Sequence, residues 1–393
     1  MAPEVTTTET SYKEHYGRFL SADPERLHFA AHSHHHWPDV TRDAMLRYWD
    51  DAAELSDDKW ERIFGTEVPS AQRHVADIIG VDHPGQVAFG ASTHEFVTRI
   101  LSGFPGGRPK RVLTTDSEFY SFARQAARLE EEGVVVERVA TEPFETFEER
   151  FTAAVEKGGH DLVFLSHVFF DSGFVVRGLD AIVEAVPDPE TVVVVDGYHS
   201  FCAVPFSIRA IQDRVFYTAG GYKYAQSGEA LGWLYVPPGC TMRPENTGWF
   251  ADFSNLKKAQ SGVQYPDDAF RFWGATFDPV GVYRFNSVMA LWDRIGLDVE
   301  KVHDKVQEAQ RLFLEKCRAD GPLDAGALLL HTDGLERQGH FFTFRTPEAQ
   351  DLYARLKAAK IMTDVRRDRL RFGFGLYHDR SDVEALFERL ERL

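Results

Sequence analysis

Cysteines and long apolar runs are scarce in this sequence, and each scarcity excludes a class of protein. The 393 residues include only three cysteines, Cys202, Cys240 and Cys317, at irregular spacing. This excludes a disulfide framework or a thiolate metal site and is typical of a reducing cytosol. No apolar run approaches the ~18 residues of a membrane span, and the first ten residues lack the pattern of a secretory signal. We therefore expect a soluble, cytoplasmic protein with no membrane partner.

Positive charge is also in the minority. Asp and Glu total 61 against 44 Lys and Arg, which gives a net charge of -17, and the basic residues form no stripe. A nucleic-acid-binding protein needs such a stripe for the phosphate backbone, so we expect no nucleic-acid partner. Apolar residues are plentiful at 43%. They suffice for a sizeable core in one large and one smaller domain.

Short β-branched runs alternate with helical patterns through the middle of the chain. Five runs begin at Val112, Val134, Asp161, Thr191 and Val215. Between the third and fourth, apolar residues at positions 179, 182, 183 and 186 follow the spacing of one helix face. Apolar strands separated by helices predict an α/β fold with a mostly parallel sheet, in which ligands bind at the carboxyl ends of the strands.

The pattern changes after about Phe277. Residues 282–317 read as mostly helical, and three alternating stretches follow at His340, Ile361 and Leu370 before a last amphipathic helix. We predict three parts: an N-terminal arm over residues 1–45, a large α/β domain over 46–277 and a small C-terminal α+β domain over 278–393.

The stretch 192–228 brings three reactive side chains together. Asp196 ends an apolar strand, His199 follows three residues later, and Lys223 comes 27 residues after Asp196. A pyridoxal phosphate (PLP) site requires such a set. A partly desolvated lysine forms a Schiff base with the cofactor aldehyde, and a carboxylate keeps the pyridine nitrogen protonated, so that the ring can accept electrons. On spacing alone, a turn-capping aspartate and a solvated lysine explain the pattern equally well.

The sequence around these residues resembles a known family. DGYHS at Asp196 and GGYKYAQSGEALGW around Lys223 resemble the signature of the fold-type I, class V PLP enzymes, most closely the kynureninase branch. The resemblance runs in order from about Leu27 to the C-terminus. It implies a mostly parallel central sheet flanked by helices, a smaller C-terminal domain, PLP as cofactor and an α-amino acid as substrate.

The resemblance implies a role for each matching residue. Lys223 matches the Schiff-base lysine, Asp196 the partner of the pyridine nitrogen and His199 the histidine beside the ring. The remaining implied cofactor contacts are the phosphate-binding Ser92, Thr93 and Tyr222, the stacking Phe119, and Ser172 near the ring substituents. Helix capping at Ser92 and Thr93 and core packing of Phe119 are the plainer explanations.

Arg371 matches the family arginine that holds the substrate α-carboxylate. It alternates with apolar residues on a predicted strand, and a guanidinium fits a carboxylate as a two-pronged fork. We expect its neighbours Arg366, Arg367 and Arg369 to be solvated. Phe169 stands where kynureninases carry asparagine, a departure from the family at a substrate contact.

Two later motifs imply an assembly. NTGWF at Asn246 and RFWGATFDP at Arg271 resemble family segments whose Trp and Thr reach the phosphate of the neighbouring subunit. The matching residues are Trp249 and Thr276. The resemblance therefore implies a homodimer with shared active sites, whereas plain core packing of Trp249 is the alternative.

Four histidines, His32, His34, His35 and His36, lie within five residues. A metal-dependent hydrolase is the alternative that this cluster raises. Adjacent histidines point in different directions and no HxxxH pair accompanies them, so we expect no metal. In the family this segment lines the substrate entrance, and His32 and His34 are therefore candidates for substrate contact or acid–base chemistry.

We predict a PLP-dependent enzyme that acts on an α-amino acid through an external aldimine. The nearest resemblance implies Cβ–Cγ cleavage of a kynurenine-like 3-acylalanine or related lyase chemistry, and class V transamination remains the alternative. A cysteine desulfurase is less favoured, because no cysteine lies in an evident Gly/Ser-rich loop. The intact set of Asp196, Lys223 and Arg371 argues against a non-catalytic binding protein.

Overall fold

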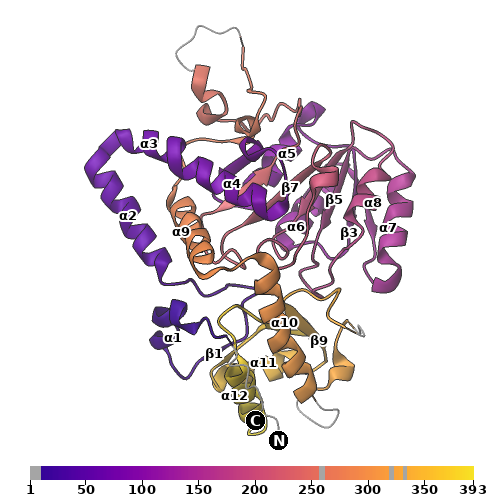
Figure 1. The fold of residues 1–393 in the computed structure, drawn as a ribbon. Coiled ribbons are helices and arrows are strands. Elements are labelled where there is room, and N and C mark those ends of the chain that lie inside the picture. The colour runs from indigo at the N-terminus through magenta and orange to yellow at the C-terminus, as the bar shows by residue number, and fades with distance from the viewer. Residues whose placement is uncertain (1–9, 256–261, 318–322, 331–333) are drawn as a thin grey trace, which may run out of the picture.

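The structure is a computed structural model that describes residues 10–255, 262–317, 323–330 and 334–393. A large α/β part occupies one end of the molecule and a smaller part, which contains the C-terminal helix, the other (Figure 1). The helices are α1 (Gly17–Ala22), α2 (Val40–Leu55), α3 (Lys59–Arg62), α4 (Val68–Ile79), α5 (Thr93–Ser102), α6 (Tyr120–Glu131), α7 (Phe147–Glu156), α8 (Leu179–Glu184), α9 (Val280–Ile295), α10 (Val299–Lys316), α11 (Ala349–Ala358) and α12 (Arg380–Leu390).

A seven-stranded sheet forms the centre of the large part. Its order is β2 (Val87–Gly90), β8 (Gly232–Tyr235), β7 (Val215–Gly220), β6 (Val192–Asp196), β5 (Leu162–Ser166), β3 (Arg111–Thr115) and β4 (Val135–Val139). The five strands from β7 to β4 pair in parallel, and β8 is antiparallel to both of its neighbours. Figure 1 shows α4 and α9 near the β7 end of this row of strands and α7 and α8 near the β3 end. The predicted fold class is confirmed.

All five predicted strands form at the predicted places. They become β3, β4, β5, β6 and β7, and the predicted helix between the third and fourth is α8. The middle strands β5, β6 and β7 are buried almost throughout, because helices cover both faces of the parallel sheet. Their carboxyl ends therefore meet at one edge of the sheet, where Ser166, Asp196 and Gly220 lie.

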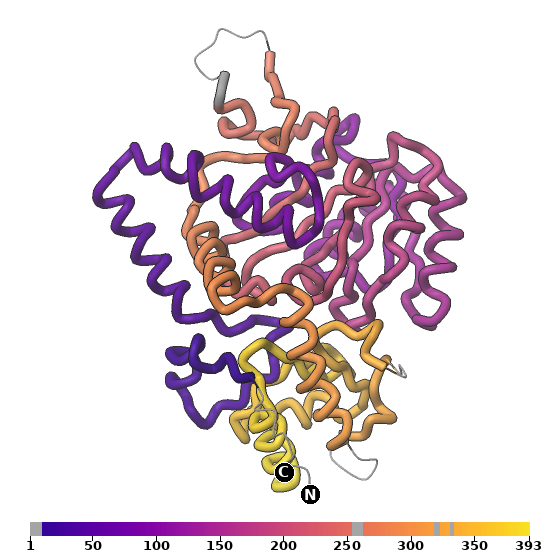
Figure 2. Tube along the Cα trace, in the orientation of Figure 1, coloured from indigo at the N-terminus to yellow at the C-terminus, as the bar shows by residue number. Residues whose placement is uncertain are grey.

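The small part is built on an antiparallel sheet of three strands, in the order β11 (Asp364–Arg366), β12 (Arg369–Gly373) and β9 (Phe341–Arg345). The predicted stretch at Ile361 is divided, because Ile361–Met362 forms a separate strand, β10, that pairs in parallel with β1 (Leu27–His28). The N-terminal segment therefore lies against the C-terminal part, as Figure 2 also shows.

Two hydrophobic clusters correspond to the two parts. The larger surrounds the seven-stranded sheet, and the smaller contains Leu27, Phe29, Phe313, Phe342 and Phe372. The predicted boundary at residue 277/278 does not coincide with the change of cluster. The buried side chains of α9 pack in the large cluster, and those of α10 join the small cluster from Val306 onward.

None of the helices in the described part of the chain combines the length and the apolar character that crossing a bilayer requires.

Candidate active site

Asp196 is delivered to the sheet edge by the valine run of β6. It is the last residue of that strand, and its Oδ1 accepts a hydrogen bond of 2.9 Å from the backbone N–H of Tyr198. Burial raises the pKa of Asp196, although this hydrogen bond and the charge of Lys223 both oppose the rise. A partly exposed carboxylate at the carboxyl end of a parallel strand is available to a ligand.

Lys223 follows β7 in a glycine-rich turn. The side chain is 6% exposed, and its Nζ lies 2.8 Å from Nε2 of His199. Burial lowers the pKa of Lys223 to about 7, although Asp196 opposes the shift. The amine is therefore substantially uncharged near neutral pH, as a nucleophile must be. Three aromatic rings have centroids near Nζ, those of Tyr198 at 4.8 Å, Phe119 at 5.4 Å and Tyr222 at 5.8 Å.

His199 and His32 meet beside this lysine. Nε2 of His199 lies 3.1 Å from the carbonyl oxygen of His32, and the His32 ring stacks on Phe341 with centroids 4.7 Å apart. Burial lowers the pKa of both imidazoles. Neither ring nitrogen of His32 has a hydrogen-bond partner among the described residues. A buried imidazole without partners is costly unless a ligand supplies them.

The N-terminus of α5 forms a second part of the site. Ser92 precedes the helix with extended backbone angles, and its side chain makes no capping hydrogen bond. Gly232 of β8 permits the close approach of this turn, because a Cβ there would lie 2.8 Å from the Thr93 backbone nitrogen. The free N–H groups and dipole of a helix N-terminus favour a phosphate.

Arg371 reaches the site from β12 of the small part, where it is 3% exposed. Its neighbours Leu370 and Phe372 are buried in the small cluster, so Arg371 lies on the other face of the strand. Nη1 donates to the Phe170 carbonyl and Nη2 to the Asp364 carboxylate, whereas Nε has no partner among the described residues. The guanidinium lies within 6 Å of two ring centroids, Phe170 at 5.7 Å and Phe341 at 5.8 Å.

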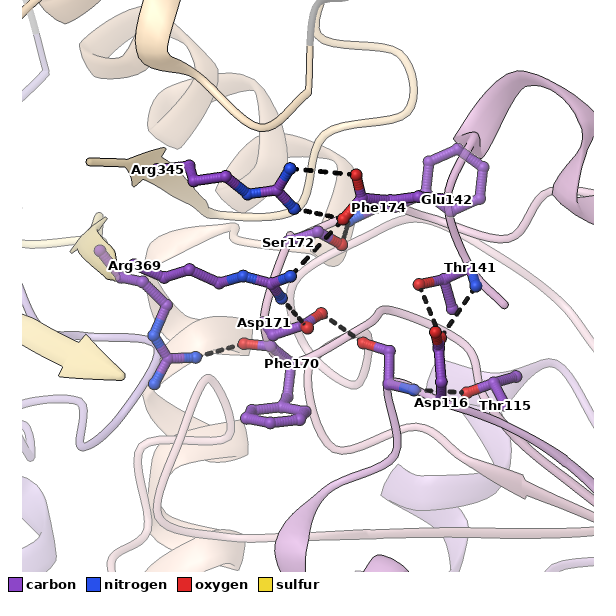
Figure 3. A network of polar contacts seen from close by, with 12 residues as sticks. Thr115, Asp116, Thr141, Glu142, Phe170, Asp171, Ser172, Phe174, Arg345 and Arg369 are labelled. Carbon is purple, nitrogen blue, oxygen red and sulfur yellow. Dashed lines mark hydrogen bonds and ion pairs between the residues drawn. The ribbon is translucent and has the colours of Figure 1, made fainter. Parts of the chain in front are cut away.

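Arg366 and Arg369 are paired with carboxylates, which corrects the expectation that they are solvated. Arg369 donates to Asp171, and Asp171 also accepts from Ser117 (Figure 3). Arg366 lies 2.7 Å from Asp364. The strand pattern predicted the face of Arg371 but not the carboxylates that lie opposite Arg366 and Arg369. Arg367 is exposed, as predicted.

Three further predicted residues lie at different depths: Tyr222 is at the rim of the site, Ser172 is buried, and Phe169 is in the core. Tyr222 is half-buried, and its ring stacks on His34 at 5.0 Å on the exposed rim of the site. Ser172 is buried and accepts a hydrogen bond of 3.1 Å from the Phe174 N–H. The Phe169 ring is fully buried against Phe147, with centroids 4.9 Å apart, and so belongs to the core.

Trp249 and Thr276 lie on the surface. The indole of Trp249 is 45% exposed and stacks on Phe250 at 4.2 Å, so it is not a plain core residue. Thr276 is exposed and lines a hollow of about 430 Å³ together with Ala91, the residue before Ser92. Both side chains are accessible from outside the chain.

The other clustered histidines have structural contacts. Nδ1 of His35 lies 2.6 Å from the His36 carbonyl oxygen, and the His36 ring stacks on Tyr377 at 4.6 Å. Within residues 10–255, 262–317, 323–330 and 334–393, no group of histidine, cysteine or carboxylate side chains has the arrangement of a metal site. The metal-hydrolase alternative therefore has no support in the described part of the chain.

The structure adds Glu118, which sequence reasoning missed. Its carboxyl group is buried at the end of β3, where the hydroxyls of Thr115 and Ser166 each lie 2.6 Å from one of its oxygens. Burial raises the pKa of Glu118 to about 8, and the charge of Asp196 adds to the rise. An acidic residue three positions after the last residue of a predicted strand was the available signal.

Together these residues fit PLP. Lys223 and Asp196 match the groups that the aldehyde and the pyridine nitrogen require, and the α5 turn matches the phosphate. The buried ring nitrogens of His32 and Nε of Arg371 have no partner among the described residues, and a polar ligand in the site would supply one.

Comparison with known proteins gives one family and one fold. The family model described as aminotransferase class-V matches residues 38–386. A search of curated proteins finds no match. Similar solved structures include the cystine C-S lyase C-DES in complex with its reaction product cysteine persulfide, with 16% identity, a TM-score of 0.77 and coverage of 93% of this chain and 97% of that chain. An apo cysteine desulfurase from Thermococcus onnurineus NA1 has 18% identity, a TM-score of 0.78 and coverage of 98% and 100%. At these identities the likeness shows the fold alone.

Proposed function

This chain belongs to the class-V aminotransferases, a family of PLP-dependent enzymes, and we propose that it cleaves a bond at Cβ of a β-substituted α-amino acid. The observation that carries the proposal is the convergence of Lys223 and Arg371 from the two parts of the molecule. Phe341 links them, since its ring lies 5.3 Å from His199, the neighbour of Lys223, and 5.8 Å from Arg371. A substrate between the two would meet an amine and a guanidinium at once.

The proposed roles follow from the chemistry of each side chain. Asp196 would hold the pyridine nitrogen, the backbone at Ser92 and Thr93 together with Tyr222 would hold the phosphate, and Phe119 would cover the ring face. His199 and Ser172 are the remaining proposed cofactor contacts. When bound, the cofactor supplies an electron sink that stabilises negative charge on the substrate.

The chain's own residues would bind and orient the substrate. Arg371 would take the α-carboxylate through Nε, its free donor, and through the remaining N–H bonds of its guanidinium. Lys223, with its lowered pKa, can accept the proton of the substrate α-carbon and return it near neutral pH. His32 and His34 are proposed to contact the substrate, His32 from a buried ring and His34 from the rim.

Kynureninase-like Cβ–Cγ cleavage is our first candidate within this proposal. The rings of Phe119 and Phe170 meet edge to face at 5.7 Å beside Arg371, which suits an aromatic substituent. The asparagine contact of kynureninases has no counterpart in Phe169, whose ring is in the core. A related lyase reaction at Cβ therefore stays within the proposal.

The burial and raised pKa values of the three cysteines argue against the persulfide transfer of a desulfurase. Cys202 is fully buried, and burial raises the pKa of Cys202, Cys240 and Cys317. A thiol whose pKa is raised is a poor nucleophile near neutral pH. Cleavage of a C–S bond needs no cysteine nucleophile and is the second candidate, a reaction that the similar structure C-DES carries in its description as a cystine C-S lyase.

We further propose a cytoplasmic homodimer with shared sites. The exposed Trp249 and Thr276 support this assembly, because each is accessible to a second copy and Thr276 lies near the α5 turn. Size measurement by light scattering, with Trp249→Ala as the variant, would check it.

An absorption spectrum with borohydride reduction tests the proposed function. The purified protein, incubated with PLP, should show the band of lysine-bound cofactor, and reduction should fix the cofactor to Lys223, whereas Lys223→Ala should show neither. Product analysis would then distinguish cleavage of a 3-acylalanine, cleavage of a C–S bond, and transfer of the amino group to a 2-oxo acid. Absence of the band in the wild-type protein would refute the proposed cofactor site.

A further inference from the structure

One face of the β11–β12 hairpin carries charged side chains toward the site. Asp364 pairs with Arg371, and Arg366 pairs with Arg369, across the two antiparallel strands. Residues at alternate positions of a strand share a face, so these four side chains lie on the same face of the hairpin. Leu370 and Phe372 alternate with them along β12 and pack on the opposite face, in the small cluster. Arg345 on β9 lies opposite Arg369 in the sheet and extends the same face.

Carboxylates compensate most of these guanidiniums. Arg345 bonds to Glu142 at the exposed edge, and Arg369 bonds to Asp171 (Figure 3). The two remaining guanidiniums, those of Arg366 and Arg371, share the single carboxylate of Asp364. Among the described residues, the ion pairs of this face therefore leave one guanidinium charge without a carboxylate of its own, beside Arg371, where the substrate carboxylate is proposed to bind.

Asp364 is placed to control that charge. The side chain is 12% exposed, and its Oδ2 accepts from Arg371 and lies 3.7 Å from Nε2 of His32. The charges of Arg366 and Arg371 both contribute to the lowered pKa of Lys223, which indicates that both act on the site. Without Asp364, two guanidinium charges would be free for ligand anions.

We propose that Asp364 is a specificity-determining residue: it acts as an internal carboxylate that leaves the site one positive charge, and thereby selects amino acids with a single carboxylate and excludes dicarboxylic ones. The inference rests on the proposed function and concerns the substrate class of the same site. Its physical basis is that a second substrate carboxylate would meet Asp364 as a like charge in a buried environment, which is strongly unfavourable.

The test is a titration of holoenzyme with L-alanine and L-aspartate, which differ by the side-chain carboxylate. Binding is measured from the change of the cofactor absorption. Asp364→Asn keeps an oxygen for Arg371 but removes the charge, and it should improve the affinity for L-aspartate relative to L-alanine by about tenfold or more. Asp364→Glu restores the charge and should restore the wild-type ratio, which a merely structural role would not require.

The control is Glu142→Gln, which removes a carboxylate from the exposed Arg345 and from Arg369, 3.5 Å away, but leaves the Asp364–Arg371 pair intact; its ratio should equal that of the wild type. An unchanged ratio in Asp364→Asn, or an equal change in Glu142→Gln, overturns the inference and leaves the proposed function intact. If Asp364→Asn does not fold, Arg366→Gln takes its place. It should weaken L-alanine binding severalfold, and unchanged binding overturns the inference. A wild-type holoenzyme whose cofactor absorption changes with neither L-alanine, L-aspartate nor a 3-acylalanine refutes the proposed function, and the inference with it.

Discussion

The amine of Lys223 and the carbonyl oxygen of His32 lie 2.8 Å and 3.1 Å from the same atom, Nε2 of His199. If that nitrogen carries a proton, it donates to the carbonyl and faces a neutral amine. If it carries none, it accepts from a charged amine. Burial lowers the pKa of both side chains, so a doubly protonated pair is excluded near neutral pH. Burial and the nearby charges of Arg371 and Arg366 therefore favour the neutral form of Lys223, and His199 lies within hydrogen-bond distance of that amine.

The first prediction concerns cofactor capture by the apoenzyme. Only the neutral amine attacks an aldehyde, so the capture rate should rise with pH up to about 7, the pKa that burial gives Lys223, and then level off. Stopped-flow absorption after mixing with PLP would measure it. The control is Nα-acetyl-lysine, whose side-chain amine is free, and its rate of reaction with PLP should keep rising toward the ordinary lysine pKa of about 10.4. A protein profile parallel to the control would contradict a lowered pKa.

The second prediction concerns His199 in proton transfer. His199→Ala removes the imidazole that lies 2.8 Å from Nζ of Lys223 and positions the amine, and exchange of the substrate α-hydrogen with D2O should slow by about 10²-fold. Proton NMR measures the exchange, and the absorption band checks that the cofactor is retained. His34→Ala, at the exposed rim, should have a smaller effect. Equal exchange rates in His199→Ala and the wild type would argue against this role.

The parallel strands were predictable because each contains a short run of β-branched or apolar residues, although β4 also contains Glu137 and Arg138. β3 to β7 could be found from residue type alone, since helices cover both faces of the sheet. β2 and β8 were not, because each has only four residues and contains a glycine. Their pairing joins Val87 to Tyr235, far along the chain, and no local pattern carries that information.

Site residues could be predicted where they belong to one contiguous sequence motif. They could not be predicted where their role depends on a contact with a residue of another strand. Asp196, His199 and Lys223 could be found from one stretch of sequence. Glu118 acquires its environment from Ser166 on another strand, and Asp364 from Arg371 across a hairpin. The predicted solvation of Arg366 and Arg369 failed for the same reason.

The third prediction concerns the approach of β8 to the α5 turn. Gly232→Ala would place a Cβ 2.8 Å from the Thr93 nitrogen and closer still to Ser92 backbone atoms, which cannot move aside as a flexible side chain can. We expect a loss of about 1–3 kcal/mol in stability and weaker PLP binding, because the phosphate turn must shift. Thermal unfolding and cofactor titration measure the two effects.

The control for this substitution is Gly85→Ala, where an added Cβ meets no atom within 4 Å. It should leave both the unfolding temperature and the PLP affinity close to wild type. If Gly232→Ala lowers stability but binds PLP as tightly as Gly85→Ala does, the turn is not a phosphate site.

The last prediction concerns the pH dependence of stability that Glu118 confers. Burial raises its pKa to about 8 in the folded protein, from 4.5 for an ordinary glutamate. Between these values the folded state retains a proton that the unfolded state releases, so stability falls as pH rises through this window and is level above it. Glu118→Gln removes this titrating group. When the pH rises from about 5 to about 8, the unfolding free energy of the variant should therefore fall less than that of the wild type, by up to roughly 4 kcal/mol. Urea unfolding at several pH values measures the difference. Glu130→Gln, on the surface, should follow the wild-type curve, and a Glu118→Gln curve that also runs parallel to wild type would mean that Glu118 titrates normally.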